Sequence, residues 1–192
     1  MKRKDCFEYL ATVFPADIVI PTYSSAFEWL VARPHPLNYV SVGAMGLASS
    51  HALGLALAMP NRRIVVLDGD GSLLMNLGTL VSVGACCPRN FLHFVSRNGT
   101  YEANGGHPLP GGEKVDFPAL ALAAGYTSAV RVDSIDALAL QVPGLLSTSG
   151  PVLIELSFQE GDTAPKADYE FIHGSEARRI FACALHSLIE KI

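Results

Sequence analysis

Charge of either sign is scarce in this sequence, and basic residues are not in excess. Lysine and arginine number 14 and aspartate and glutamate 18 among 192 residues, which gives a formal net charge of −4 at pH 7. Proteins that bind nucleic acid usually carry a basic surface, so we expect no nucleic acid partner. Hydrophobic residues make up 49% and charged residues 17%. This balance predicts a sheet buried on both faces and a surface that another subunit covers.

Long hydrophobic runs are also missing. The apolar stretch over residues 44–59 is interrupted by Ser49, Ser50 and His51. It is therefore too short and too polar to cross a bilayer. Residues 2–5 are charged and no apolar segment follows them, so we predict no signal peptide. We expect a soluble, cytoplasmic protein without a membrane partner.

Cysteine is rare and has no metal-ligand spacing. The four cysteines are Cys6, Cys86, Cys87 and Cys183. Adjacent cysteines such as Cys86 and Cys87 rarely bridge each other, so we expect reduced and buried thiols.

Helical and strand patterns alternate along the chain, without repeats or linkers. Strands are expected at residues 17–20, 63–67, 91–96 and 151–158, and extended chain at 38–42. Helices are expected at residues 2–13, 24–31, 47–59, 72–84, 116–125 and 174–192, and after Asp133 or Ser134. This alternation predicts one α/β domain over residues 1–192, with a doubly wound, mostly parallel sheet and helices on both faces. Residues 97–115 lack periodicity and are expected to form a long functional loop.

A Gly-Asp-Gly turn directly follows the clearest strand, at residues 63–67, and opens a helix. It consists of Gly69, Asp70 and Gly71, followed by Ser72. Glycines let a ligand approach the backbone, and the N–H groups at a helix start attract phosphate. An aspartate would repel a diphosphate unless a cation lay between them, so Asp70 favours Mg²⁺ together with a diphosphate. Taken alone, the same residues could form a simple turn.

A second polar segment follows the next strand, where Asn98 stands between Arg97 and Gly99. Neighbouring strand ends in a sheet lie about 5 Å apart. Asp70 and Asn98 can therefore share one ion if their strands are neighbours. Asn98 offers an amide oxygen, and a carbonyl of the glycine-containing turn can add a third ligand. Diphosphate oxygens and water would complete the octahedron that Mg²⁺ prefers.

Together the two segments resemble the motif of thiamine diphosphate enzymes, a Gly-Asp-Gly followed at this spacing by a strand that ends in Asn-Asn. Here Arg97 replaces the first asparagine, and Asn98 is the second. The resemblance implies that Asp70, Asn98 and the carbonyl of Thr100 hold Mg²⁺. It also implies cofactor contacts from Gly69, Gly71, Ser72 and Tyr101.

Residues 41–46 resemble the segment that lies under the middle of the cofactor in this family. The resemblance assigns to Gly43 the carbonyl that holds the 4′-amino group, and to Met45 the apolar side chain that bends the cofactor. The bend brings the amino nitrogen near the thiazolium carbon whose deprotonation starts catalysis. The alternative is that Met45 is a core residue and the glycines pack a helix.

The match runs over about residues 17–160 and is closest to the phosphonopyruvate and sulfopyruvate decarboxylases. It rests on Gly-x-Met-Gly at 43–46, Asp-Gly-Asp-Gly at 68–71, Met-Asn at 75–76, Pro-Arg-Asn-Phe at 88–91 and Gly-Gly-His-Pro at 105–108. That branch often has a basic residue near a glutamate after the first strand. The corresponding residues 22–28 hold Glu28 but no basic residue, which argues against a strongly anionic substrate.

The glutamate that activates the cofactor in this family comes from another type of domain. A chain used entirely by one domain leaves no room for it. The resemblance therefore implies an active site completed by a separate pyrimidine-binding, alpha-type subunit, in a hetero- or homo-oligomer.

We accordingly expect the thiamine diphosphate- and Mg²⁺-binding subunit of a 2-oxoacid decarboxylase. One alternative is a carboligase or synthase subunit of the same superfamily. A non-catalytic thiamine diphosphate-binding module is another. A nicotinamide dehydrogenase is disfavoured, because Gly69 and Gly71 lack the third glycine of its fingerprint.

Two residues just past the metal motif are candidates for catalysis. Glu102 and His107 could face the substrate carboxylate or assist proton transfer, a role that suits histidine near neutral pH. The alternative is that both are solvated loop residues. His51 and His93 lie in apolar segments and are expected to be buried histidines with hydrogen-bond partners.

Overall fold

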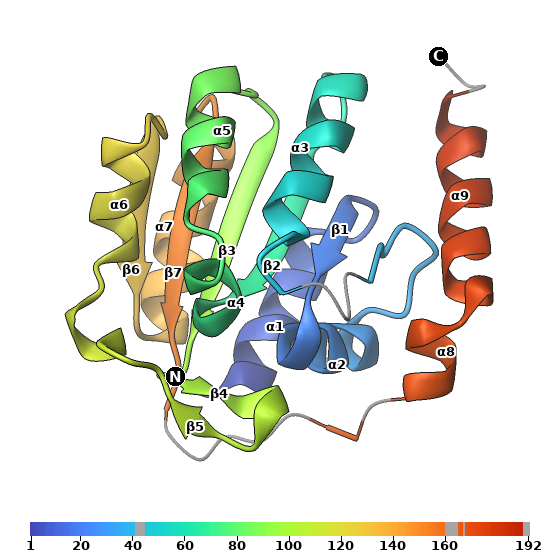
Figure 1. The fold of residues 1–192 in the computed structure, drawn as a ribbon. Coiled ribbons are helices and arrows are strands. Elements are labelled where there is room, and N and C mark those ends of the chain that lie inside the picture. Colours follow the sequence, from blue (N-terminus) through green and yellow to red (C-terminus); the bar gives the residue numbers. More distant parts are fainter. Residues whose placement is uncertain (41–44, 160–164, 167, 190–192) are drawn as a thin grey trace.

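A five-stranded parallel sheet forms the centre of the computed structural model, which describes residues 1–40, 45–159, 165–166 and 168–189. Every strand pairing in this sheet is parallel, and the strand order is β1-β2-β3-β7-β6 (Figure 1). The strands are β1 (Ile18–Pro21), β2 (Ile64–Gly69), β3 (Phe91–Arg97), β6 (Ser128–Val132) and β7 (Val152–Ser157). The predicted α/β fold with a parallel sheet is confirmed.

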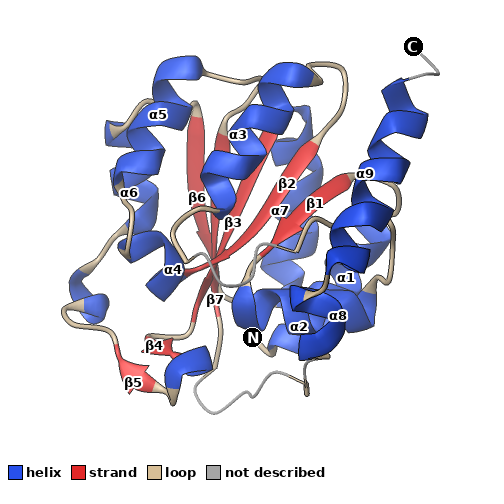
Figure 2. Cartoon of the chain, turned by 45° about the vertical axis from the view of Figure 1, so that its right-hand side comes forward, coloured by secondary structure: helices blue, strands red, loops and turns tan. Residues whose placement is uncertain are grey.

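Helices cover both faces of the sheet and enclose one apolar core on each side (Figure 2). One core packs beneath α3 (Ala48–Ala58), α5 (Gly78–Cys86), α6 (Phe117–Ala123) and α9 (Ser175–Ile189). The other packs beneath α1 (Arg3–Val13), α2 (Tyr23–Ala32) and α7 (Ile135–Ser147). On β2, Ile64 and Val66 belong to the first core, whereas Val65 and Leu67 belong to the second. Alternating side chains thus meet apolar partners on both faces, which explains why this strand is continuously hydrophobic.

The carboxyl ends of β2 and β3 lie side by side. Their parallel register pairs Gly69 with Ser96. A short helix, α4 (Asp70–Leu74), begins directly after β2. Sequence segments that follow these two strands are therefore brought together at one edge of the sheet.

The helix predicted over residues 72–84 is interrupted. It consists of α4 and α5, which are separated at residues 75–77. Asn76 lies in this break, where its side-chain Nδ2 donates to the carbonyl of Gly46 at 3.1 Å. Asn76 and Gly78 are weak helix formers, so the side-chain bond outweighs helix continuity here.

Some expected boundaries differ from the structure. The loop at 97–115 contains a hairpin of β4 (Thr100–Tyr101) and β5 (His107–Pro108) and the 3₁₀ turns η1 (Glu102–Asn104) and η2 (Gly112–Lys114). Strand β6 was not predicted, and α8 (Tyr169–His173) precedes α9 as a separate helix. None of the described helices is long and apolar enough to span a membrane.

The cysteines are reduced, but the prediction that all are buried is wrong. Cys6 lies on the buried side of α1, whereas Cys86, Cys87 and Cys183 are exposed. Cys86 is the last residue of α5. Cys87 follows it as the helix C-cap and has a left-handed backbone conformation with φ of 46°. Burial raises the pKa of the Cys6 thiol, so this side chain behaves as an apolar core residue.

Candidate functional site

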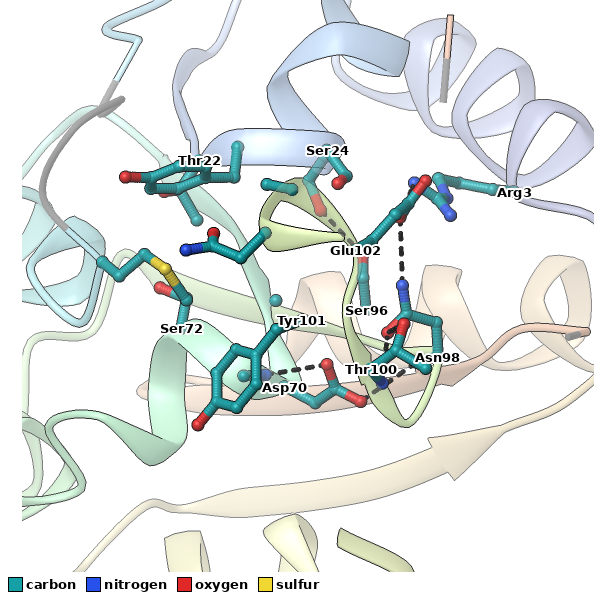
Figure 3. Close-up of a pocket in the computed structure, with 17 residues that line it drawn as sticks. Arg3, Thr22, Ser24, Asp70, Ser72, Ser96, Asn98, Thr100, Tyr101 and Glu102 are labelled. Atoms are coloured by element: carbon teal, nitrogen blue, oxygen red, sulfur yellow. Dashed lines mark hydrogen bonds and ion pairs between the residues drawn. The ribbon is translucent and has the colours of Figure 1, made fainter. Parts of the chain in front are cut away.

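The carboxylate of Asp70 joins the ends of β2 and β3 (Figure 3). Its Oδ2 accepts backbone N–H groups from Asn98 at 3.0 Å and Gly99 at 2.8 Å. Its Oδ1 accepts the N–H of Gly71 at 2.7 Å. The expectation that Asp70 and Asn98 lie at neighbouring strand ends is therefore correct.

Asp70 is a buried acidic group whose carboxylate accepts backbone N–H groups. The residue is 3% exposed. Burial raises the pKa of the carboxyl, while the three backbone N–H groups and the charge of Arg97 lower it. A buried carboxylate has lost its hydration, and a cation beside it would favour the ionised form. Burial and geometry together suit Asp70 to hold a positive ion.

The side-chain amide of Asn98 has a defined orientation. Its Nδ2 donates to Oε2 of Glu102 at 3.0 Å, and its Oδ1 accepts the backbone N–H of Thr100 at 3.0 Å. Donor and acceptor ends of the amide are thus distinguished by their partners. The amide oxygen stands on the Thr100 side of the group, as Figure 3 shows.

Two glycines of the motif have different surroundings. A Cβ at Gly71 would lie 2.7 Å from the ring Cδ1 of Tyr101, so no side chain fits between this turn and the ring. At Gly69 the nearest atom to such a Cβ is the Cβ of Ser72, 4.0 Å away. The backbone at Gly69 therefore stays open to an approaching group.

The turn before α3 is tied to α4. The backbone N–H of Gly46 donates to Oγ of Ser72 at 3.0 Å. Gly46 has φ of +80°, and a Cβ there would lie 2.8 Å from the Cβ of Asn76. Met45 is half-buried and lines the same cavity as Asp70, so it is not a core residue. Gly43 lies outside the described residues.

A small polar cavity opens at this edge of the sheet, with a volume of about 40 Å³. All the described residues predicted to contact cofactor or metal line it. Sequence reasoning missed further lining residues, among them Arg3, Thr22, Tyr23, Ser24, Ser25 and Ser96. The first turn of α2 could have been found, because it follows the carboxyl end of β1, the neighbour of β2. Arg3 carried no such signal.

A larger hollow of about 430 Å³ lies between α2, α8 and α9. Its lining is mostly apolar, with side chains such as Phe27, Leu30, Phe171 and Ile180. None of the predicted site residues that the structure describes borders it. We take the polar cavity as the candidate site because the polar groups converge there, although it is the smaller of the two.

Comparison with known proteins identifies the family. The model for the thiamine pyrophosphate enzyme, C-terminal TPP binding domain, matches residues 21–156. The chain belongs to the thiamine pyrophosphate enzyme family. Thiamine pyrophosphate is the same compound as thiamine diphosphate, so the predicted family is confirmed. The matched residues run from the end of β1 into β7 and include both segments that meet at Asp70.

Relatives of two lengths share this domain. The chain is 39% identical to phosphonopyruvate decarboxylase of Streptomyces viridochromogenes over 161 residues, which cover 83% of this chain and 40% of that protein. It is 33% identical to sulfopyruvate decarboxylase subunit beta of Methanothermobacter thermautotrophicus, covering 84% of each. The chain therefore spans about two fifths of the first relative and most of the second. The predicted branch of the family is confirmed.

Solved structures agree on the fold. Benzoylformate decarboxylase from Polynucleobacter necessarius superposes with a TM-score of 0.71 over 85% of this chain and 34% of that chain. The two sequences are 23% identical. At this identity the likeness establishes the shared fold alone.

Arg97, which departs from the Asn-Asn of the thiamine enzyme motif, has a structural partner. Its Nη1 lies 2.9 Å from Oε1 of Glu155, and its Nη2 donates to the carbonyl of Gly112 at 3.0 Å. Glu155 is fully buried and also pairs with Arg131, whose Nε lies 2.7 Å from Oε1. The Arg97 side chain is thus ion-paired with Glu155 of β7. The backbone N–H of Asn98 still donates to Asp70.

The two candidate catalytic residues differ in position. Glu102 lines the cavity, where its carboxylate lies 2.8 Å from Nη1 of Arg3 and accepts from Asn98. His107 is exposed on β5 and is not among the residues that line the cavity. The structure thus places Glu102 beside Asn98 and leaves His107 outside the cavity lining.

The histidines of the apolar segments also differ. His93 is buried, with Nδ1 3.1 Å from the hydroxyl of Tyr126 and Nε2 3.4 Å from Oδ2 of Asp68, as predicted. His51 is exposed and packs edge-on against Tyr39, with ring centroids 5.4 Å apart. The prediction of a buried His51 is therefore wrong, because it lies on the outer side of α3.

The residues present fit the cofactor of thiamine pyrophosphate enzymes. Among the described residues, histidine, cysteine, aspartate and glutamate form no cluster of three that could hold a metal ion. Asp70 and Asn98 instead offer carboxylate and amide oxygens, which are hard ligands suited to Mg²⁺. Beside them the backbone at Gly69 is open. Oxygen donors next to an accessible backbone match a metal-bound diphosphate.

Proposed function

We propose that this chain binds thiamine diphosphate through Mg²⁺ at the ends of β2 and β3, as part of a 2-oxoacid decarboxylase. The observation that supports this proposal most directly is the buried carboxylate of Asp70, which accepts three backbone N–H groups between the two strand ends. Asp70, Asn98 and the carbonyl of Thr100 would hold the metal. When bound, thiamine diphosphate supplies the stabilisation of carbanions on which decarboxylation depends.

The chain's own residues would bind and orient the cofactor. Asp70 offsets the charge of Mg²⁺, and the open backbone at Gly69 admits the diphosphate. Met45 lines the same cavity and would supply the apolar side chain that the family resemblance assigns to it. The hydroxyl groups of α2 border the same space, with Ser25 Oγ donating to Ser96 Oγ at 3.0 Å. These contacts fix orientation, which lowers the entropic part of a reaction barrier.

The decarboxylase activity is supported by the relatives. Phosphonopyruvate decarboxylase and sulfopyruvate decarboxylase subunit beta both match over more than four fifths of this chain. Both names describe the loss of carbon dioxide from a 2-oxoacid. A carboligase or synthase subunit, or a non-catalytic binding module, is the alternative that an activity measurement separates from this proposal.

The site calls for a second, pyrimidine-binding subunit. The described residues line a cavity of about 40 Å³, whereas ligand pockets that enclose a small molecule span about 300–1,000 Å³. The relative that this chain matches over 84% of its length is itself named a beta subunit. Both features support an active site completed by another chain.

One face of the molecule suits such a partner. Helices α3 and α5 pack against each other and contain no lysine, arginine, aspartate or glutamate. Their outer side exposes Leu57 by 54% and Val81 by 61%, and Met75 between α4 and α5 is 61% exposed. An uncharged, apolar exposed face is typical of a protein interface.

The test is a decarboxylation assay of the purified chain, alone and with a candidate alpha-type subunit. We expect carbon dioxide release from a 2-oxoacid only when chain, partner, Mg²⁺ and thiamine diphosphate are combined. Val81→Asp should reduce activity at limiting partner concentration, because it places a charge on the α3–α5 face. Leu140→Asp on α7 is the matched control, since Leu140 is 83% exposed and lies on the other side of the sheet.

Three outcomes of this assay oppose the proposal or its requirement for a partner. Formation of a new carbon–carbon bond without net release of a free aldehyde would favour the carboligase. Cofactor binding with no turnover of any 2-oxoacid by the combined chains would favour the non-catalytic module. Full activity of the isolated chain would exclude the need for a partner.

A further inference from the structure

We propose that Glu102 and Arg3 are positioning residues that hold the side-chain amide of Asn98 with its oxygen available for the metal. This inference rests on the proposed function, because it assumes that Asn98 is a ligand. It assigns Glu102 a role other than acid–base catalysis. It also links α1, which lies outside the matched residues 21–156, to the metal site.

The two ends of the Asn98 side-chain amide have different hydrogen-bond partners. Oxygen and nitrogen are nearly equal in size, and only the oxygen can bind a cation. Glu102 Oε2 accepts from Asn98 Nδ2 at 3.0 Å. An ionised carboxylate accepts hydrogen bonds and cannot donate them, so it selects the nitrogen. Turning the amide over would place its oxygen against the carboxylate and would repel it.

The oxygen end of the amide faces Thr100. Asn98 Oδ1 accepts the backbone N–H of Thr100 at 3.0 Å and lies 3.4 Å from the Thr100 hydroxyl. The oxygen thus faces the turn whose carbonyl is the third proposed ligand. Figure 3 shows the Asn98 amide between Glu102 on one side and Thr100 on the other.

The carboxylate of Glu102 is itself held by Arg3. Nη1 of Arg3 lies 2.8 Å from Oε2, the same oxygen that accepts from Asn98. The side chain of Arg3 is 3% exposed and that of Glu102 is 22% exposed, so water screens this pair less than a surface pair. The guanidinium also lies over the ring of Phe158, 5.8 Å from its centroid. Arg3 therefore fixes the position of the carboxylate that orients Asn98.

A competing role for Arg3 is direct contact with an anionic substrate. Among the described residues that line the cavity, Arg3 is the one with a permanent positive charge. Its Nη1, however, is already engaged by Glu102. The two roles predict different behaviour for the metal, since a direct substrate contact leaves Mg²⁺ binding to Asn98 unchanged.

The test measures Mg²⁺ affinity by calorimetry at saturating thiamine diphosphate for the wild-type chain, Arg3→Ala, Glu102→Ala and the double variant. Glu102→Ala should weaken Mg²⁺ binding about tenfold, an order of magnitude typical of a lost hydrogen bond to a charged group. Arg3→Ala should weaken it several-fold. The double variant should bind no more weakly than Glu102→Ala, because Arg3 acts through Glu102.

The sign of the Arg3→Ala effect is decisive. Removing a positive charge near a cation site strengthens cation binding if only long-range electrostatics operate. Weaker binding in Arg3→Ala therefore requires the positioning role. Arg3→Lys keeps the charge and should recover part of the loss. Lys4→Ala is the matched control, since Lys4 is on the same helix and its side chain is 69% exposed.

A second readout needs neither metal nor cofactor. In a ¹⁵N–¹H spectrum of the apo chain, the two side-chain NH₂ signals of Asn98 should shift in Glu102→Ala and Arg3→Ala but not in Lys4→Ala. Glu102→Gln removes the charge and keeps an acceptor, so it should lie between wild type and Glu102→Ala. Thermal unfolding of each variant checks that the fold is retained, and Glu102→Gln tests the proposal even where Arg3→Ala fails to fold.

Failure of this inference is distinct from failure of the proposed function. A wild-type chain that binds neither Mg²⁺ nor thiamine diphosphate overturns both. Wild-type binding with unchanged affinity in Glu102→Ala and Arg3→Ala overturns the positioning role alone. Tighter Mg²⁺ binding in Arg3→Ala, or losses that add in the double variant, would also overturn it.

Discussion

At the scale of single residues, two glycines of one motif can be separated by experiment. A Cβ at Gly71 would lie 2.7 Å from Cδ1 and 2.8 Å from Cε1 of the Tyr101 ring. Gly69 has φ of −105° and ψ of 153°, which any residue can adopt, and apart from its chain neighbours the nearest atom to its Cβ position is 4.0 Å away. Gly71 is thus required by packing, whereas Gly69 is required only if a ligand approaches the backbone.

We predict opposite results for alanine at these two positions. Gly71→Ala should lower the free energy of unfolding by about 1–3 kcal/mol, because overpacking displaces Tyr101. Gly69→Ala should leave that free energy unchanged but weaken binding of Mg²⁺ and thiamine diphosphate. Urea unfolding and calorimetric titration measure the two effects. Normal cofactor binding by Gly69→Ala would show that no ligand approaches this backbone.

The site residues that directly follow strands of the sheet could be predicted from the sequence alone. Asp70 and Asn98 follow consecutive strands, so their meeting at one edge could be predicted from the order of elements. Arg3 could not, because its approach to Glu102 depends on how α1 packs over the sheet. The exposure of His51 depends on the same kind of packing, since α3 is apolar on most sides and its outer side cannot be recognised from composition.

At the scale of elements, a buried polar chain connects β2, β3 and the segment before β6. His93 on β3 lies between Asp68 on β2 and Tyr126, and all three are at most 4% exposed. Burial raises the pKa of the Tyr126 hydroxyl, and the charge of Asp68 adds to this, so the group stays protonated and can donate. Buried polar groups fix register when each has a partner.

Tyr126→Phe should therefore destabilise the fold by about 1–3 kcal/mol, because it leaves Nδ1 of His93 buried without a partner. Tyr39→Phe is the control: among the described residues no hydrogen bond of the Tyr39 hydroxyl is found, and the change should stay within about 0.5 kcal/mol. The free energy of unfolding in urea measures both. Equal stability of the two variants would mean that the network contributes nothing.

The elements that sequence patterns revealed are those with strong periodicity or clear caps. β2 is continuous and apolar because both of its faces are buried. The start of α6 was expected at Asp116, and the Asp116 side chain accepts from the N–H of Ala119 at 3.1 Å. β6 was missed because it is an edge strand, half-exposed over most of its length and containing Arg131. Its pairing with β7 is a tertiary effect that local pattern does not encode.

At the scale of the whole molecule, the low content of charged residues is reflected in one exposed face. The low share of charged residues predicted a covered surface, and the uncharged helices α3 and α5 form an apolar exposed face. The matched domain covers residues 21–156, and α1 and α9 pack on it from outside that segment. Because the polar cavity is small and lies at the carboxyl ends of β2 and β3, we propose that this chain forms one side of a shared site.

The most direct measurement is a calorimetric titration of the purified chain with thiamine diphosphate, in the presence of Mg²⁺ and then of EDTA. Wild type and the exposed-carboxylate control Asp136→Ala should bind the cofactor with Mg²⁺ and lose it with EDTA. Asp70→Ala should give no heat while keeping an unchanged circular dichroism spectrum, because its buried ligand is gone. Normal binding by Asp70→Ala, or wild-type binding that ignores Mg²⁺, would contradict the proposed metal site.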